Sequence, residues 1–293
     1  MTRRVKAPPL GETLIERKTL FRRALLKWYR REKRDLFWRG TSDPYAVWVV
    51  EIILQQTRVE QGGPYIKRFL AAFPTVQDLA RATPDRVLKL WEGLGYYTRA
   101  RNLHKAAKII ADERSGRFPE TAEDWQQLPG VGRYTAGAIA SIAFGESAPV
   151  LDGNVKRVLA RLIDLDASID DGAVTENLWA LAALFVRGKL PGDFNQAMME
   201  LGANVCTPRA PACEVCPVSK FCFAFERGTQ SQRPVRKPKK AVPHYEIVVA
   251  AIKKNGRYLL GKRPPEGLLG GLWEFPGGKV KPGETHAAAL RRS

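Results

Sequence analysis

The chain has 293 residues, of which 44% are hydrophobic, and its 48 Lys and Arg against 30 Asp and Glu give a net charge of +18 at pH 7. A chain of this length can hold two domains, and its hydrophobic content argues against wholesale disorder. It has no apolar run long enough to span a membrane and no apolar signal core after its first residues, so we expect a cytoplasmic protein without a membrane partner.

Basic residues concentrate in the flanks of the chain. Residues 1–39 carry 13 Lys and Arg against 4 acids, and residues 227–243 carry 6 against none, whereas residues 40–226 carry 20 against 22. Basic flanks attract a polyanion through counterion release, and a merely solvated surface is the alternative. The charge distribution therefore favours a nucleic acid as the partner.

Helical periodicity dominates the sequence between residues 20 and 205. Residues 19–34 predict a helix with an apolar face opposite a basic face. The apolar face comprises Leu20, Phe21, Ala24, Leu25, Trp28 and Tyr29. Residues 48–57 predict an almost wholly apolar helix ending in amide side chains. Further helices are expected at 84–94, 98–115, just after Thr121, and at 134–144, 155–163, 173–186 and 193–205.

Glu51 stands out within the apolar helix at 48–57. Most side chains three and four positions away from it are apolar, so its carboxyl group shares their face of the helix. Apolar surroundings disfavour a carboxylate, and a carboxyl group that keeps its proton near neutral pH suits general acid catalysis. The alternative is a glutamate paired with an arginine inside the core.

Two glycine-containing turns are candidates for contact with a ligand. Leu128-Pro-Gly-Val-Gly132 precedes a helix of small residues, so the amides at the start of that helix can hold an anion. This pattern predicts a helix–hairpin–helix that binds a DNA phosphate, with an ordinary glycine turn as the alternative. In Gly93-Leu-Gly-Tyr-Tyr97, the two tyrosines either stack on bases or fill the core.

Asp152 lies at the start of the helix expected at 155–163. Aspartate is a standard N-cap residue, which explains its presence by structure alone. The functional interpretation places its carboxylate at the mouth of the cleft that holds the phosphate. The two interpretations are compatible.

All the cysteines of the chain fall in one short run, with the spacing Cys-x6-Cys-x2-Cys-x5-Cys. They are Cys206, Cys213, Cys216 and Cys222. Clustered cysteines in a chain without a secretion signal predict metal binding rather than disulfides. Four thiolates suit zinc or an iron–sulfur cluster, and the uneven spacing favours a cubane cluster.

The C-terminal part changes in composition and period. Residues 227–243 contain three prolines and six basic residues, which is typical of a linker. Residues 245–262 predict two strands joined by Asn255-Gly256, a type I′ hairpin signal. The following Leu272-Trp-Glu-Phe-Pro-Gly-Gly-Lys and Gly278-x5-Glu284 resemble the start of a Nudix fold. The acidic metal-binding run is missing, so we expect no pyrophosphohydrolase activity and poor folding of this half-domain alone.

Six motifs occur in order over residues 20–225 and together resemble one family. They are Glu51-x3-Gln55-Gln56-Thr57, Gly93-Leu-Gly-Tyr-Tyr97, Leu128-Pro-Gly-Val-Gly132, Leu151-Asp-Gly-Asn-Val-Lys-Arg157, Phe194-Asn-Gln-Ala-Met-Met-Glu-Leu-Gly202 and the cysteine run. The set is similar to that of helix–hairpin–helix DNA glycosylases with an iron–sulfur cluster, specifically their adenine DNA glycosylase branch. The resemblance implies a mainly α, two-lobed core (1–226) with a [4Fe-4S] loop (206–222), the linker (227–243) and an incomplete Nudix-like α+β segment (244–293).

The resemblance also implies a role for individual residues. Glu51 would protonate N7 of a flipped adenine, and ionised Asp152 would stabilise or trap the oxocarbenium sugar. Tyr134 and Asn154 would orient these acids, with Arg39 and Glu200 supporting them. Contacts to DNA would come from Gln56, Thr57, Leu94, Tyr96 and the amides of Gly130 and Gly132. The implied partner is double-stranded DNA with adenine opposite 8-oxoguanine or guanine, bound by a monomer that leaves an abasic site.

Tyr134 separates this branch from its endonuclease III-like neighbours, which carry a lysine at that position. A phenol cannot form the Schiff base needed for strand cleavage, so we expect a monofunctional glycosylase. Three alternatives remain at this point. They are an endonuclease III-like glycosylase/lyase acting on damaged pyrimidines, a non-catalytic iron–sulfur DNA-binding protein, and a nucleotide-pool hydrolase.

Overall fold

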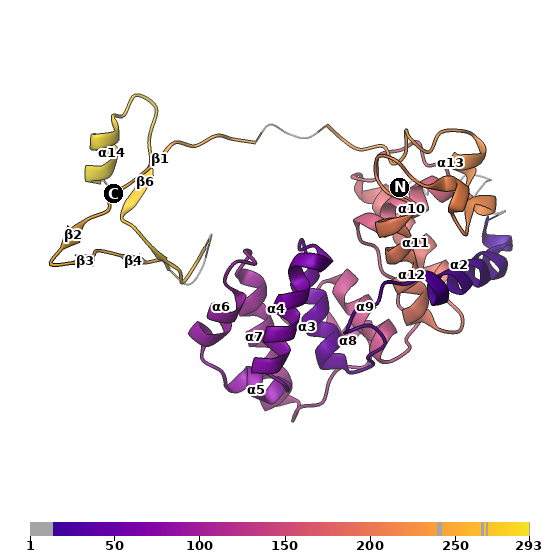
Figure 1. Cartoon of the computed structure of the whole chain (residues 1–293), viewed down its shortest axis with the longest axis horizontal. Coiled ribbons are helices and arrows are strands. Elements are labelled where there is room, and N and C mark those ends of the chain that lie inside the picture. Colours follow the sequence, from indigo (N-terminus) through magenta and orange to yellow (C-terminus); the bar gives the residue numbers. More distant parts are fainter. Residues whose placement is uncertain (1–13, 239–241, 265–266, 268, 293) are drawn as a thin grey trace, which may run out of the picture.

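The computed structural model describes residues 14–238, 242–264, 267 and 269–292 (Figure 1). Helices make up most of the chain up to residue 226, and short strands with one helix make up the C-terminal part. In the part of the chain that the structure describes, no helix is both long and apolar enough to cross a membrane. The observed architecture is the expected mainly α core followed by a small α+β segment.

Most of the expected helices are present, with shifted ends. The first lobe holds α3 (Pro44–Leu54), α4 (Val59–Ala72), α5 (Val76–Arg81), α6 (Pro84–Trp91), α7 (Thr98–Lys108), the π-helical turn η1 (Ile109–Glu113), α8 (Ala122–Trp125) and α9 (Arg133–Ala143). The second lobe holds α2 (Lys18–Glu32), α10 (Gly153–Leu162), α11 (Gly172–Val186), α12 (Pro191–Asn204), the 3₁₀ turns η2 (Cys213–Val215) and η3 (Ser219–Phe221), and α13 (Phe223–Glu226).

Two hydrophobic cores define these lobes. One core is built from α3 to α9, which are contiguous in sequence, and the other from α2 together with α10 to α13. Figure 1 shows α2 beside α12 although some 160 residues of chain separate them, and the two helices are in contact. Helix α9 joins the lobes, because Ile139 packs in the first core and Ala138 in the second.

Small residues allow α9 to pack closely against its neighbours. A Cβ on Gly137 would lie 2.1 Å from the carbonyl oxygen of Pro149, and one on Gly192 of α12 would lie 2.6 Å from that of Ser141. Real Cβ atoms do not approach backbone so closely. Gly137 therefore sets the distance between α9 and the segment that leads to Asp152, and Gly192 sets the distance between α9 and α12.

The structure corrects several expectations about the helices. Leu20, expected on the buried face of the first helix, is 55% exposed, whereas Arg22, expected on the basic face, is buried. The Arg22 guanidinium binds the carbonyls of Phe185, Val186 and Lys189, where α11 ends and its last carbonyls lack helical partners. Helix α3 ends at Leu54, so the amide side chains follow the helix instead of ending it.

Helices α4 and α5 are elements that the sequence analysis does not anticipate. Helix α4 contains Gly62, Gly63 and Pro64, residues that lower helix propensity in a helix interior. Tertiary packing offsets this cost, because Gly62 lets the helix approach Leu54, whose Cδ2 would lie 2.6 Å from an added Cβ. Helix α5 has six residues and starts with a capping box between Thr75 and Asp78.

In the C-terminal segment, the described residues form three two-stranded antiparallel ladders and one helix. They are β1 (Ile247–Val249) with β6 (Gly277–Lys279), β2 (Lys253–Lys254) with β3 (Arg257–Tyr258), β4 (Gly261–Lys262) with β5 (Trp273–Glu274), and α14 (His286–Arg292). The Asn255-Gly256 hairpin is confirmed, with positive φ at both residues. Much of this segment's apolar surface is exposed, including Trp273 at 64%.

Part of the segment expected as a linker lies against the second lobe. Asp164, at the end of α10, forms ion pairs with Arg227 and Arg233, and the amide of Ile169 donates to the carbonyl of Val235. Residues 227–235 therefore have fixed partners on the helical core. The domain boundaries given above stay a prediction.

Gly137→Ala should destabilise the protein by about 1–3 kcal/mol, because the added Cβ overpacks against Pro149 and the backbone cannot yield easily. Helix propensity alone would favour the alanine. Chemical denaturation with far-UV circular dichroism measures the change. Gly172→Ala, where an added Cβ meets nothing within 4 Å, serves as the control and should be neutral or stabilising. Equal effects at the two positions would contradict the packing argument.

Candidate active site

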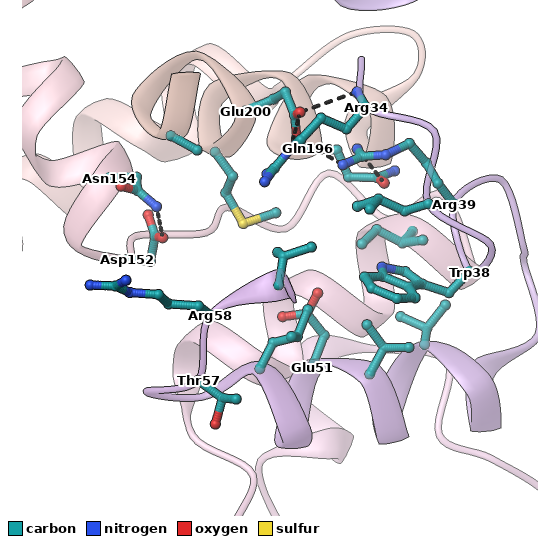
Figure 2. A pocket seen from close by; sticks show the side chains of 18 of the residues that line it. Arg34, Trp38, Arg39, Glu51, Thr57, Arg58, Asp152, Asn154, Gln196 and Glu200 are labelled. Carbon is teal, nitrogen blue, oxygen red and sulfur yellow. Dashed lines mark hydrogen bonds and ion pairs between the residues drawn. The ribbon is translucent and has the colours of Figure 1, made fainter. Parts of the chain in front are cut away.

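A pocket of about 370 Å³ opens between the two lobes. This volume lies in the range of small-molecule sites. Figure 2 shows Glu51 on one side of the pocket, Asp152 and Asn154 on another, and Gln196 and Glu200 on a third. The side chains come from α3 and the connections on either side of it, the start of α4, α9, the start of α10, and α12. The pocket therefore exists only when both lobes are folded and joined.

Glu51 projects from the middle of α3 into this pocket. Asp43 caps the helix and Pro44 occupies its first position, and the rest of α3 is almost wholly apolar and buried. Burial, with a smaller contribution from the charge of Asp152, raises the pKa of Glu51 to about 7. The hydroxyl of Tyr134 donates a hydrogen bond to Glu51 Oε2 at 2.9 Å, which opposes the shift. The site therefore favours the protonated carboxyl group more than water does.

Asp152 faces the same pocket from the N-terminus of α10. It is the N-cap, and its Oδ1 accepts from the amide of Val155 at 2.7 Å. Its Oδ2 accepts from the Asn154 side chain at 3.0 Å. Burial raises the pKa of Asp152 above its usual value, although these hydrogen bonds and the charge of Arg157 oppose the shift. The N-cap interpretation is confirmed, and the same carboxylate also lines the pocket.

The two carboxyl groups therefore have different partners. Glu51 receives one hydrogen bond, from a phenol, and lies among apolar side chains, whereas Asp152 receives donors at both oxygens beside the positive end of a helix dipole. Unequal environments of this kind separate the pKa values of paired acids and assign them different protonation states. The arrangement favours the protonated form of Glu51, and the hydrogen bonds to Asp152 favour its ionised form.

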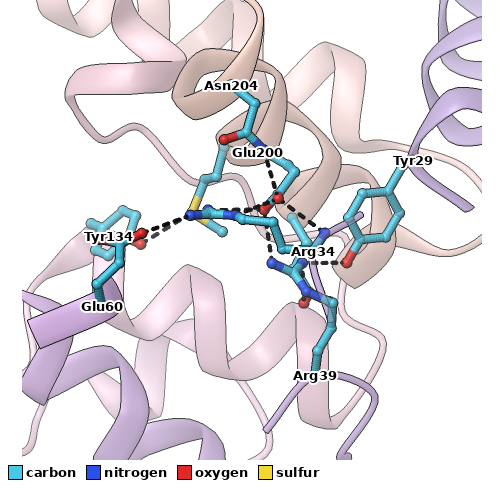
Figure 3. A network of polar contacts seen from close by, with 9 residues as sticks. Tyr29, Arg34, Arg39, Glu60, Tyr134, Glu200 and Asn204 are labelled. Atoms are coloured by element: carbon cyan, nitrogen blue, oxygen red, sulfur yellow. Dashed lines mark hydrogen bonds and ion pairs between the residues drawn. The ribbon is translucent and has the colours of Figure 1, made fainter. Parts of the chain in front are cut away.

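Glu200 anchors a polar network on the far wall (Figure 3). Its side chain is 2% exposed and accepts from Arg34 Nε at 2.6 Å and Arg39 Nη2 at 2.8 Å. Burial alone would raise the pKa of Glu200, but hydrogen bonds and charge from the two arginines lower it below its usual value. Tyr29 and Asn204 complete the network. The expected support by Arg39 and Glu200 thus has a geometric basis: they tie the connection before α3 to α12.

The sequence analysis overlooks several pocket residues. Trp38 and Met199 contribute apolar wall, and Gln196 presents an amide, with its Oε1 accepting from Arg39 at 3.4 Å. Gln196 lies inside the Phe194–Gly202 motif, three positions before Met199 and four before Glu200, so helical spacing could have identified it as a neighbour of both. Arg34 carries no such signal, because it stands among many basic residues at the end of α2.

The residues expected to contact DNA occupy three separate turns. Gln56 and Tyr96 are exposed, and both have positive φ, at 56° and 46°. Thr57 lines the rim of the pocket. The structure does not place Leu94 at the surface, because its side chain is 8% exposed and packs in the core of the first lobe. This burial corrects the expectation that the leucine side chain lies ready to enter a duplex.

The glycine turn before α9 has the geometry that its sequence indicates. Gly130 has φ 77° and approaches Asn102, whose Cβ would lie 2.6 Å from an added Cβ. Gly132 is the N-cap of α9, has nothing within 4 Å of its added Cβ, and leaves the first amides of the helix without a side-chain cap. An open helix N-terminus is a suitable site for a phosphate.

The four cysteines lie around one cavity. All four are free thiols, and they line this small cavity together with Arg161 and Pro211. Among the described residues, no group of three or more His, Cys, Asp or Glu has the arrangement that would hold a metal ion. Burial raises the pKa of Cys222 to about 11, so thiolates here require positive charge close by.

Two arginines of α10 supply positive charge beside this cavity. Arg161, 2% exposed, donates to Cys206 Sγ at 3.2 Å and to the carbonyl of Thr207 at 2.7 Å. Arg157 donates to the carbonyl of Cys206 at 2.8 Å and to Asn154 Oδ1 at 2.9 Å. Arg157 therefore connects the cysteine loop to the residue that orients Asp152.

Comparison with known proteins identifies the architecture. Residues 49–183 match the HhH-GPD superfamily of base excision DNA repair proteins, and residues 206–222 match the iron–sulfur binding domain of endonuclease III. Adenine DNA glycosylase of Buchnera aphidicola subsp. Acyrthosiphon pisum is 37% identical over 90% of this chain and 76% of its own. The chain belongs to the adenine DNA glycosylase family. Accordingly, the cysteine loop is a [4Fe-4S] site, and residues 247–293 match the NUDIX domain.

Other relatives extend the adenine DNA glycosylase comparison to mammals. The Mus musculus protein is 42% identical over 92% of this chain, and the chain spans 62% of that relative's length. A thermostable thymine-DNA glycosylase structure superposes with a TM-score of 0.64 at 29% identity, covering 72% of this chain and 98% of its own. A trapped endonuclease III–DNA covalent intermediate superposes with a TM-score of 0.59 at 22% identity over 73% and 98%, which shows the shared fold alone.

Tyr134→Phe should raise the pKa of Glu51 further. The Tyr134 hydroxyl stabilises the ionised carboxylate through its hydrogen bond, so its removal favours the protonated form. Carboxyl carbon NMR of selectively labelled protein, titrated from about pH 5 to about pH 9, measures the midpoint. A midpoint that falls, or that stays at the value of the unchanged protein, would contradict the assigned contact.

Proposed function

We propose that this protein is a monofunctional DNA glycosylase that flips adenine out of a mispair with 8-oxoguanine or guanine and hydrolyses its N-glycosidic bond. The observation that carries the proposal is the pair formed by Glu51 and Asp152 across one pocket, with a proton held on the first acid. A buried base cannot reach such a pocket from within a duplex, so the reaction requires base flipping.

The first chemical step is proton transfer to the leaving base. Adenine is a poor leaving group as an anion, and protonation at N7 lets it depart as the neutral base. Glu51, with its pKa near 7, is matched to donate this proton at neutral pH. The Tyr134 hydroxyl fixes the carboxyl orientation through its bond to Oε2. The carbon–nitrogen bond to the sugar then breaks and leaves its electron pair on the base.

The second step concerns the sugar. Loss of the base gives the deoxyribose oxocarbenium character, which the Asp152 carboxylate stabilises by charge or traps as an ester, as in retaining glycosidases. Its donors from Val155 and Asn154 hold the carboxylate at the pocket wall. Water, activated by the now ionised Glu51, completes hydrolysis and returns a proton to that residue. The product is an abasic sugar in an intact strand.

The described surfaces around the pocket suit a duplex. Gln56, Thr57 and Tyr96 lie on exposed turns where they would contact the opposite base, and the open amides at Gly130 and Gly132 would hold a backbone phosphate. The net charge of +18 strengthens attraction to DNA. The proposal treats the active form as a monomer, because both acids come from one chain.

An oligonucleotide assay tests the function. A duplex with adenine opposite 8-oxoguanine should give an abasic product that breaks only after alkali, and Glu51→Gln should slow its formation by about 10²–10⁴-fold. Since Glu51 must be protonated to act, the rate should fall as pH rises through about 7. Lys105→Gln, on an exposed position of α7, is the control and should retain the rate. Full activity of Glu51→Gln would refute the proposal.

Tyr134→Lys should introduce some strand cleavage, because an amine beside the sugar can form the Schiff base that a phenol cannot. The expected evidence is a borohydride-trapped protein–DNA adduct, measured by the shift of a labelled oligonucleotide on a denaturing gel. The unchanged protein should give little adduct and cleave only after alkali. Strand cleavage by the unchanged protein without alkali, at the rate of base release, would favour an endonuclease III-like lyase.

A further inference from the structure

Arg99 occupies the second position of α7 and points into the first lobe. Its guanidinium donates to five main-chain carbonyls, those of Ile52, Ile53, Gln55, Leu94 and Gly95. Three of these carbonyls belong to the C-terminal end of α3, and two belong to the turn at residues 93–97. In the described part of the chain, Arg99 is the one residue whose hydrogen bonds reach both segments.

The two segments need such an external partner. The last carbonyls of a helix lack intrahelical donors, and α3 ends at Leu54 without a glycine to close it. Gln56 and Tyr96, which follow in the two turns, adopt left-handed backbone conformations that non-glycine residues rarely hold. A conformation of this kind persists only when its surroundings fix it. A planar guanidinium with five donors is suited to hold several carbonyls at once.

Both turns present side chains to the outside, and the turn after α3 adjoins the pocket. Tyr96 is 64% exposed and Gln56 is exposed, while Leu54 and Thr57 line the pocket. The guanidinium carbon of Arg99 also lies 5.6 Å from the ring centre of Tyr96 and 5.3 Å from that of Trp91. The same contact that closes α3, the helix of Glu51, therefore fixes the direction of both exposed side chains.

We propose that Arg99 is a positioning residue that clamps the turns of Gln56 and Tyr96 into one rigid element, preorganised to enter the duplex opposite the flipped base. The inference rests on the proposed function. Arg99 touches neither the base nor the sugar, and it acts through the two side chains that it orients. Its loss should weaken duplex binding and discrimination of the opposite base, and it should leave proton transfer by Glu51 unchanged.

The test compares Arg99→Gln and Arg99→Lys with Lys105→Gln, an exposed charge change on the same helix. Dissociation constants are measured in a Glu51→Gln background, which keeps a duplex with adenine opposite 8-oxoguanine intact, and single-turnover rates are measured with Glu51 present. Arg99→Gln should raise the dissociation constant about tenfold and slow the saturated rate by less than about threefold. Arg99→Lys should be intermediate, and the midpoint of the pH profile should stay unchanged.

A double-mutant cycle separates positioning from general damage. In a Gln56→Ala/Tyr96→Ala background, Arg99→Gln should add little to the dissociation constant, because the residues through which it acts are gone. Full additivity of the changes in binding free energy would overturn the inference. So would a dissociation constant for Arg99→Gln alone that stays within about twofold of the parent protein. Circular dichroism and cluster absorbance monitor folding. If Arg99→Gln does not fold, the same cycle of dissociation constants is measured with Arg99→Lys. If the unchanged protein binds but releases no adenine, the proposed function fails while the binding cycle still tests the clamp.

Discussion

A carboxyl group that holds its proton near neutral pH is the constraint on which the site depends. Glu51 can do so only because α3 is apolar on all sides of it and because its one hydrogen-bond donor is a phenol and not a cation. Arg34 and Arg39, two of the arginines that line the pocket, are bound to Glu200, and Arg58 lines the pocket as well. A cation paired with Glu51 would stabilise its carboxylate and lower its pKa.

Helix α10 connects this chemistry to the cysteine loop through one short element. Asp152 caps its start, Arg157 holds both Asn154 and the carbonyl of Cys206, and Arg161 reaches the sulfur of Cys206 near its end. A cluster held by the four cysteines would supply negative charge beside the two buried arginines, which connect the cysteine loop to the helix carrying Asp152. The proposed hydrolysis of a glycosidic bond requires no electron transfer, so these contacts support a structural role for the cluster.

Much of the architecture could be predicted from sequence because its signals are local. Helix caps at Thr83, Thr121 and Asp152, the cysteine spacing, and the Asn255-Gly256 turn each depend on a few neighbouring residues, and all are found. Helix α4 was missed because Gly62, Gly63 and Pro64 oppose helix formation locally and are compensated only by packing. Leu20, Arg22 and Leu94 were misplaced for the same reason, since periodicity alone does not reveal which neighbour covers a side chain.

In the site, too, residues with a local sequence signal could be predicted, and residues placed by tertiary packing could not. Glu51 was singled out by its apolar neighbours in the sequence, and Asp152 by its place at a helix start together with the family resemblance. The structure places both on one pocket, whereas Gln196 and Trp38 reach it only through the joining of two lobes. That joining has a consequence for biosynthesis. The lobe carrying Glu51 is contiguous in sequence, so it can fold as soon as it emerges from the ribosome, whereas α2 must wait for α10 to α13 before its apolar face is covered. Nascent chains therefore expose the apolar face of α2 until translation has passed the cysteines. Asp152 is held beside Glu51 only after that point.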